Sequence, residues 1–141
     1  MNFINVNQYT NKKRHWMRGK GFVCVYVVAP APEGPSKVGY AVDIFGRMKG
    51  MQTGNWVKLY VHSALWCAGP PVAHRVEEVT HFKLMDHAIG GEWFNIRPEE
   101  AEEAVKKVAA ELYPSLRFPD HNEMVAMLKT LPLDKRDHVA A

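Results

Sequence analysis

The sequence predicts a small α/β domain, of the α+β type, in which a mainly antiparallel sheet of three to four strands is flanked by helices. Three observations indicate this class. Segments rich in β-branched residues alternate with segments of helical periodicity, in the order β-β-α-β-α-β-α. A short loop rich in proline and glycine separates the first two strands, which favours an antiparallel hairpin. The length of 141 residues suits one compact core.

Three segments are predicted to be strands, and a fourth to be a short extended piece. Residues 22–28 (FVCVYVV) form a continuous apolar run, which is typical of a buried strand. Residues 29–36 (APAPEGPS) form the loop, and residues 37–40 form the second strand. Residues 56–67 show partial alternation of apolar and polar side chains, so we expect a third strand there. Residues 92–96 are the short extended piece.

Four segments are predicted to be helical: residues 43–51, 70–86, 98–113 and 119–131. Asp43 is a suitable N-cap for the first of them. In the second, Val72, Val76 and Val79 form an apolar stripe that Lys83 extends. The third begins at a proline, which is favoured at the first helical position.

The chain is expected to divide into three parts. Residues 1–20 form a basic N-terminal arm or an extra helix, residues 21–113 form the α+β domain, and residues 114–141 form a helical extension whose last ten residues fray. Four large aromatic residues are predicted to belong to the core: Trp56, Trp66, Trp93 and Phe94.

Several classes of protein are excluded. No apolar run approaches the roughly 20 residues needed to cross a bilayer. The N-terminus lacks a charged segment followed by an apolar one, so it does not resemble a signal peptide. Cys24 and Cys67 each lie within an apolar run, and their spacing fits neither a disulfide framework nor a zinc site. We therefore expect two buried, reduced thiols and a cytoplasmic protein.

Basic residues gather before the first strand. The net charge is +3, which permits nucleic-acid binding without requiring it. The cluster consists of Lys12, Lys13, Arg14, His15, Arg18 and Lys20, with Trp16 among them. Such a cluster can neutralise phosphates while an aromatic ring stacks on a base. A solvated basic leader explains the same residues, so both interpretations stand.

Four further segments occur in a recognisable order: VYV (25–27), KVGYAVDIFGRMKGMQTGN (37–55), HRVEEVTH (74–81) and GEWF (91–94). Together, at this spacing, they resemble the GIY-YIG nuclease superfamily, specifically its T5orf172-like branch. The resemblance covers roughly residues 21–110. It implies a metal-dependent endonuclease that hydrolyses DNA phosphodiester bonds with Mg²⁺ or Mn²⁺, and it leaves open whether the DNA is branched or single-stranded. Small members of this branch are often products of phages or mobile elements.

The resemblance assigns roles to three residues of the hairpin. Tyr26 matches the tyrosine of the first half-motif, Lys37 stands where the second half-motif begins, and Gly39 matches its glycine. A phenol has an ordinary pKa of about 10 and is a poor base, but a nearby cation such as Lys37 favours the phenolate. Gly39 lets backbone or nucleic acid approach closely. Val25 and Lys37 depart from the residues that name the superfamily, which leaves Tyr26 as the candidate base and the route of the proton open.

Three helical residues complete the expected site. Arg47 matches the family's helix arginine, and its guanidinium suits a phosphate. Glu77 matches the metal-binding glutamate, since Mg²⁺ prefers oxygen ligands. His81, one turn later, is expected to contact a phosphate or to support the metal-binding residue. A zinc site including His74 and Glu78 is an alternative, although the spacing is not His-Glu-x-x-His.

Each of these residues also has an ordinary structural explanation, as strand core or as helix surface. Glu92 of the GEWF segment is interpreted as structural, capping a helix or pairing with a basic residue. The rival function is a non-catalytic nucleic-acid-binding or protein-interaction module on the same fold. A third possibility is a scaffold with the residues scattered. The alternatives differ in whether Tyr26, Lys37, Arg47 and Glu77 converge on one cleft.

Overall fold

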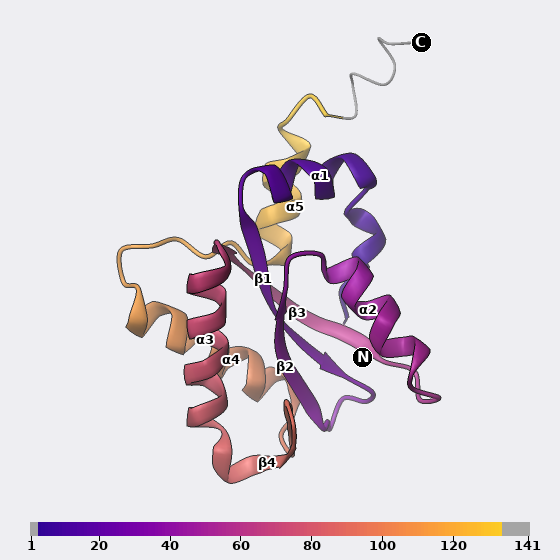
Figure 1. Cartoon of the computed structure of the whole chain (residues 1–141), viewed down its shortest axis with the longest axis vertical. Coiled ribbons are helices and arrows are strands. Elements are labelled where there is room, and N and C mark those ends of the chain that lie inside the picture. The colour runs from indigo at the N-terminus through magenta and orange to yellow at the C-terminus, as the bar shows by residue number, and fades with distance from the viewer. Residues whose placement is uncertain (1–2, 134–141) are drawn as a thin grey trace.

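A computed structural model of the chain describes residues 3–133 (Figure 1). The strands are β1 (Phe22–Ala29), β2 (Ser36–Ala41), β3 (Tyr60–Ala68), β4 (Ala88–Gly90) and β5 (Trp93–Phe94), and the helices are α1 (Asn11–Gly19), α2 (Ile44–Thr53), α3 (Pro70–Lys83), α4 (Pro98–Leu112) and α5 (His121–Lys129). Short 3₁₀ turns cover Val6–Gln8 and Met85–His87. The fraying predicted for the last ten residues falls on residues 132–141, of which 134–141 lie outside the described part.

The strands form one antiparallel sheet in the order β3-β1-β2-β5-β4. The predicted fold class is confirmed. The described sheet has five strands rather than three to four, because the segment predicted as one extended piece contributes β5 and the turn before it contributes β4. No helix among residues 3–133 is long and apolar enough to span a membrane.

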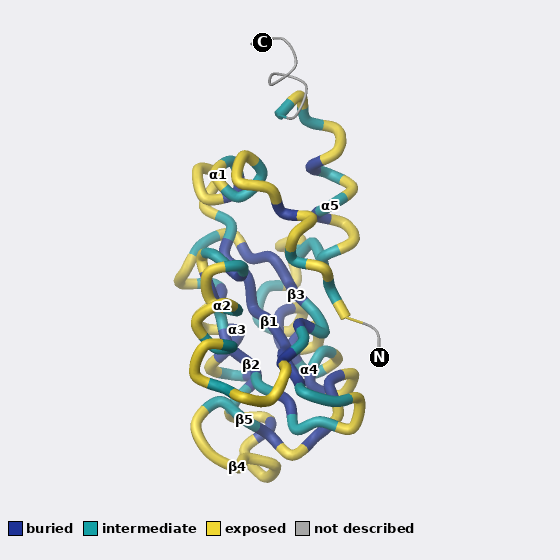
Figure 2. The backbone as a smooth tube through the Cα atoms, turned by 90° about the vertical axis from the view of Figure 1, so that its right-hand side faces the viewer, coloured by how far each residue is buried: buried dark blue, intermediate teal, exposed yellow. Residues whose placement is uncertain are grey.

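Strand β1 lies between β3 and β2 and is covered on both faces, which is why its sequence is apolar throughout. Alternate side chains enter two separate core clusters, one containing Val23, Val25 and Val27, the other Cys24, Tyr26 and Val28. The first cluster packs against α3 and α4, the second against α1, α2 and α5. Figure 2 shows the buried backbone of β1 and of part of β3, and in Figure 1 these strands run between α3 and α4 on one side and α2 on the other.

The inner face of α3 differs from the predicted stripe. Val76 is buried as expected, but Val72 and Val79 are only half-buried and Lys83 is exposed. The fully inward positions also include Glu77 and Thr80, along with Ala73. The helix is therefore rotated so that a carboxylate, rather than an aliphatic row alone, faces the sheet, and Lys83 does not extend the buried line.

Both ends of the described chain pack on the sheet. Tyr9 and Met17 from the N-terminal segment and Met124 from α5 are buried in the second cluster. Segments near both ends of the chain also hydrogen-bond to the outer edge of β3. The Ile4 backbone N–H donates to Val61 O at 2.7 Å, and the Trp66 backbone N–H donates to Pro119 O at 2.8 Å. The segment expected to be an arm or an extra helix thus contains α1, which belongs to the core.

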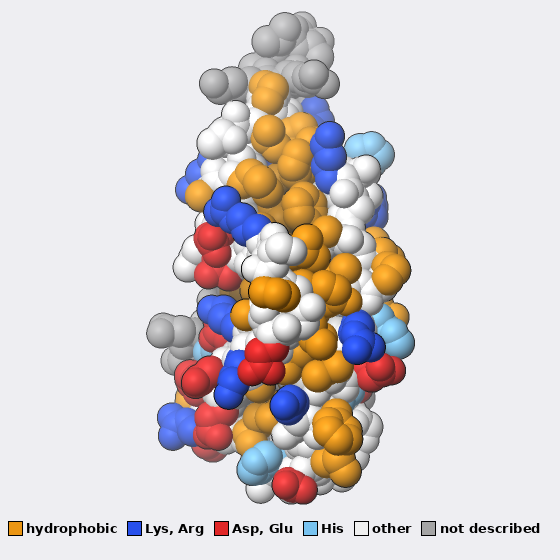
Figure 3. Space-filling model, turned by 90° about the vertical axis from the view of Figure 1, so that its left-hand side faces the viewer, with side chains coloured by type: hydrophobic (Ala, Val, Ile, Leu, Met, Phe, Trp, Pro, Cys, Tyr) orange, Lys and Arg blue, Asp and Glu red, His pale blue; other side chains and the backbone are white. Residues whose placement is uncertain are grey.

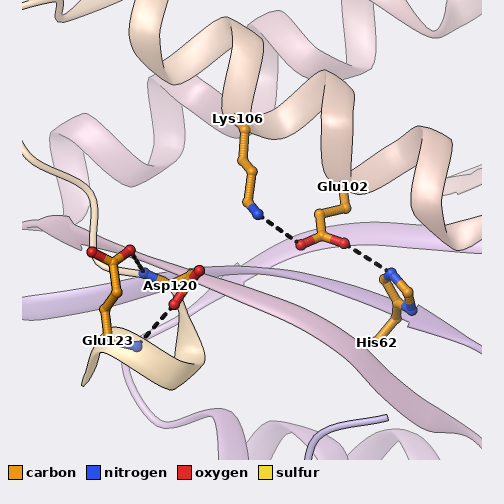
Figure 4. A network of polar contacts seen from close by, with 5 residues as sticks. All are labelled: His62, Glu102, Lys106, Asp120 and Glu123. Atoms are coloured by element: carbon orange, nitrogen blue, oxygen red, sulfur yellow. Dashed lines mark hydrogen bonds and ion pairs between the residues drawn. The ribbon is translucent and has the colours of Figure 1, made fainter. Parts of the chain in front are cut away.

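Polar contacts fix α4 against β3 and stabilise the start of α5 (Figure 4). Glu102 of α4 accepts from His62 Nε2 of β3 at 2.9 Å and is also 2.9 Å from Lys106 Nζ. A capping box begins α5: Glu123 N–H donates to Asp120 Oδ1 at 2.9 Å, and Asp120 N–H donates to Glu123 Oε1 at 3.3 Å.

The four aromatic residues predicted for the core have different environments. Trp66 and Phe94 are buried, and Trp93 is half-buried. The prediction for Trp56 was wrong, because its side chain is 97% exposed. The third strand begins at Tyr60 rather than at Trp56, so the segment between α2 and β3 is a turn that leaves the indole outside the sheet.

Both cysteines are buried free thiols, as predicted. Burial raises the pKa of each thiol, that of Cys67 to about 12. Because the thiolate is the reactive form, we expect a disulfide reagent at mildly alkaline pH to label the native protein only as fast as it unfolds. In denaturant both thiols should react at once. Rapid labelling of Cys24 or Cys67 in the native protein would contradict the structure.

Candidate functional site

The phenol of Tyr26 crosses β2 at Gly39. The two residues are opposite each other in the hairpin register. A Cβ placed on Gly39 would lie 2.3 Å from the phenol Oη and 2.6 Å from its Cζ. Only glycine leaves room for this approach, so the hydroxyl passes over β2 towards its outer edge.

Helix α3 is attached to that outer edge. Strand β5 pairs only with the first two residues of β2, so the next stretch of β2 is met by α3. His81 Nε2 lies 2.7 Å from Val38 O, and since a carbonyl only accepts, Nε2 must carry the proton. One turn earlier, Glu77 interacts with the backbone N–H of Tyr40. His81 therefore holds α3 so that Glu77 reaches the edge of β2.

Glu77 is a carboxylate in an unusual place, only 7% exposed. Burial raises its pKa, and the charge of Glu92 adds to this, while His81, His74 and the Tyr40 amide act in the opposite direction. Among residues 3–133, no lysine or arginine lies in ion-pair contact with it. A buried oxygen ligand whose charge is not offset by a lysine or arginine fits a divalent cation such as Mg²⁺. The zinc alternative finds no support, since no three His, Cys, Asp or Glu side chains of residues 3–133 are arranged so that together they could hold a metal ion.

Glu92 is the residue of this site that the sequence analysis did not assign. Its Oε1 lies 3.0 Å from the Cβ position of Gly39, so it and the phenol of Tyr26 share the space above that glycine. It also lies 3.8 Å from Lys37 Nζ, which agrees with the predicted pairing to a basic residue. The signal that could have revealed a further role was its position in GEWF, directly after the turn that returns the chain to Lys37.

The protonation of Tyr26 differs from expectation. Burial raises the pKa of its phenol, the charges of Glu92 and Glu77 raise it further, and the charge of Arg47 lowers it. Lys37 is paired with Glu92 instead of favouring the phenolate. In the protein alone, Tyr26 is thus a neutral phenol that can donate a hydrogen bond.

Arg47 approaches from the other side of the cluster. It is exposed on α2, near the N-cap Asp43, which accepts from the amides of Phe45 and Gly46. Its guanidinium charge reaches the Tyr26 phenol, and its side chain lines a shallow groove of about 640 Å³. The structure thus brings Tyr26, Arg47, Glu77 and Glu92 into one electrostatic neighbourhood, with Lys37 held beside Glu92.

The basic residues of the N-terminal segment lie on α1, next to the start of α2. Arg14 lies 3.8 Å from Asp43 and its guanidinium is 4.4 Å from the centre of the Phe45 ring. Lys20 lies over Trp16 at 5.9 Å. The remaining members are Lys12, Lys13, His15 and Arg18. Their role in nucleic-acid binding stays a prediction, but α1 adjoins the helix that carries Arg47.

Comparison with known protein families identifies one match. Residues 21–109 match the T5orf172 domain, from the start of β1 into α4. No characterised protein and no solved structure shows significant similarity to the chain. Every residue of the cluster around Gly39 lies inside the matched segment, whereas α1 and α5 lie outside it. The chain belongs to the T5orf172 domain family.

Proposed function

We propose that this protein is a metal-dependent endonuclease of the GIY-YIG superfamily that hydrolyses DNA phosphodiester bonds. The main support is that Tyr26 and Glu92 meet above Gly39 and that the charges of Arg47 and Glu77 also act on the Tyr26 phenol. The T5orf172 domain points to the same class, a nuclease-like or DNA-associated function. A cytoplasmic location agrees with two free thiols.

Each residue of the cluster has a separate role in phosphodiester hydrolysis. Arg47 presents a planar, permanently charged fork to a phosphate oxygen. Tyr26 is 1% exposed, so its phenol can donate a hydrogen bond only to a phosphate oxygen or a water that reaches the space above Gly39. The proton acceptor is then a carboxylate, and Glu92 is the one beside the phenol, above Gly39. Lys37 orients that carboxylate through its ion pair.

Glu77 would hold Mg²⁺ or Mn²⁺, because hard cations take oxygen ligands. When bound, such an ion supplies positive charge to the phosphoryl oxygens during the displacement. His81 contributes by fixing α3 to the backbone of Val38, which keeps Glu77 at the edge of β2. We assign it a positioning role.

The test is cleavage of supercoiled plasmid and of branched DNA by the full chain. We expect nicking with Mn²⁺ or Mg²⁺ and none in EDTA. A second candidate, a non-catalytic DNA-binding module, is favoured by the protonated Tyr26 and by the pairing of Lys37 with Glu92. Tight, salt-dependent binding with no cleavage under any metal would establish that module and refute the endonuclease.

A further inference from the structure

Trp56 is the most exposed large hydrophobic residue in the described chain, with 97% of its surface accessible. A tryptophan normally buries a large area on folding, and its burial is a major source of stability. Leaving the whole indole in water gives up that stabilisation. An indole in this position presents its whole face to a ligand, and stacking on a base is one contact that such a ring can make.

The turn that carries Trp56 is braced on both sides of the indole. The side-chain amide of Gln52 donates to Asn55 O and to Val57 O, each at 3.0 Å, and its Oε1 accepts from Leu59 N–H at 2.9 Å. Asn55 Oδ1 accepts from Val57 N–H at 3.0 Å. Trp56 is therefore held outward before any ligand arrives, which lowers the entropic cost of binding.

A groove of about 440 Å³ begins next to this turn, between α2, β3 and the N-terminal segment. Its walls include the rings of Phe3, Phe45 and Tyr60 and two lysines, Lys49 and Lys58. Phe3 and Tyr60 are in ring contact, with centroids 4.8 Å apart. Among residues 3–133, no aspartate or glutamate lines the groove.

The lining of the groove carries charge of one sign, because its charged side chains in the described chain are Lys49 and Lys58. Between Ile44 and Val76 the sequence contains no aspartate or glutamate but four basic residues. The face seen in Figure 3 differs, since acidic and basic side chains are interspersed there. Lysines beside exposed rings match a ligand that carries both phosphates and stacking bases.

We propose that Trp56, Lys49 and Lys58 form a binding surface for the unpaired nucleotides of a single-stranded nucleic acid, with a base stacked on the indole. The ligand class rests on the proposed function, but cleavage is not required. Arg47 lies on the opposite flank of α2, in the groove that contains Gly46 and Gly50. To reach Trp56, a nucleic-acid strand bound at the Gly39 cluster would pass around the C-terminal end of α2. That end lies about 9 Å along the helix axis from Arg47.

The experiment measures the binding of a labelled single-stranded oligothymidylate to the full chain in EDTA, by fluorescence anisotropy at several salt concentrations. Trp56→Ala should weaken binding about tenfold, the scale of one lost base–aromatic stack, whereas Trp56→Phe should retain most of it. Lys49→Gln and Lys58→Gln should each lower the salt slope by about 0.7. Phe82→Ala is the matched control, because this ring is also exposed, at 70%, but lies on α3.

Two results would overturn the proposal: wild-type affinity in Trp56→Ala, or no binding of oligothymidylate at all. Misfolding is controlled by thermal unfolding, which an exposed side chain should leave unchanged. If the wild-type protein cleaves no DNA but its binding of oligothymidylate depends on Trp56, the endonuclease is refuted and the binding surface stands. If the wild-type protein cleaves DNA but its binding does not depend on Trp56, the binding surface is refuted and the endonuclease stands.

Discussion

Replacing Glu77 with glutamine is expected to reduce Mn²⁺-dependent cleavage at least about a hundredfold and to raise the thermal stability of the metal-free protein at neutral pH. The loss of activity follows from removing the buried metal ligand, since even partners of metal ligands cost 10- to about 100-fold when lost. The gain in stability follows from removing a carboxylate that burial and Glu92 destabilise when it is ionised.

The pH dependence of that gain has a definite sign. Because the pKa of Glu77 is raised on folding, the folded state binds its proton more tightly than the unfolded chain does. The ionised carboxylate is thus unfavourable at neutral pH. This penalty disappears as the pH falls through the raised pKa towards the ordinary value of 4.5. The melting temperature of Glu77→Gln should exceed that of wild type by a few degrees at pH 7 and match it in acid.

Glu78→Gln is the control, since this neighbour is exposed on α3. It should change neither cleavage nor the melting temperature. Adding Mn²⁺ should stabilise wild type and Glu78→Gln but not Glu77→Gln. Cleavage that survives in Glu77→Gln, or a lower melting temperature at pH 7, would refute the assignment of Glu77.

The second large effect is expected from Gly39→Ala, which should destabilise the protein by about 1–3 kcal/mol, the usual cost of overpacking, and abolish cleavage. The new methyl group would lie 2.3 Å from the Tyr26 Oη and 3.0 Å from Glu92 Oε1. The Tyr26 ring is 1% exposed, so it cannot move aside without disturbing the core. Both effects arise because the phenol and the carboxylate occupy the space above the glycine.

Urea unfolding and plasmid cleavage measure this prediction. Gly50→Ala is the matched control, because nothing lies within 4 Å of its added Cβ and alanine is the better helix former. In a Tyr26→Ala background, Gly39→Ala should cost far less than in wild type, as expected for residues in direct contact. A fully stable Gly39→Ala protein would show that the phenol does not cross β2 there.

Local sequence patterns predicted the parts of the fold that depend on neighbouring residues. The apolar run of β1 and the loop after it specified the hairpin, and the hairpin register places Tyr26 opposite Gly39. Strands β4 and β5 have three and two residues, too few to show alternation. The core prediction for Trp56 fails because the turn that Gln52 stabilises leaves no periodic signal in the sequence.

The features of the site that could not be predicted from the sequence depend on contacts between distant segments. Glu92 meets Lys37 only because two residue pairs join β5 to β2, and no local pattern specifies that pairing. The same contact removes the cation that was expected to act on Tyr26. The burial of Glu77 follows from the rotation of α3, which His81 sets by binding the backbone of Val38. A helical stripe of valines cannot reveal that rotation.

The covered edges of the sheet limit how this protein can recognise a partner. Within residues 3–133, the backbone of Ile4 and Pro119 occupies the margin of β3, and α3 occupies the stretch of β2 beyond β5. The outermost strand, β4, spans three residues. Extended peptides therefore find little unsatisfied main chain to pair with, and edge-to-edge aggregation lacks a template. Recognition must instead be carried by side chains.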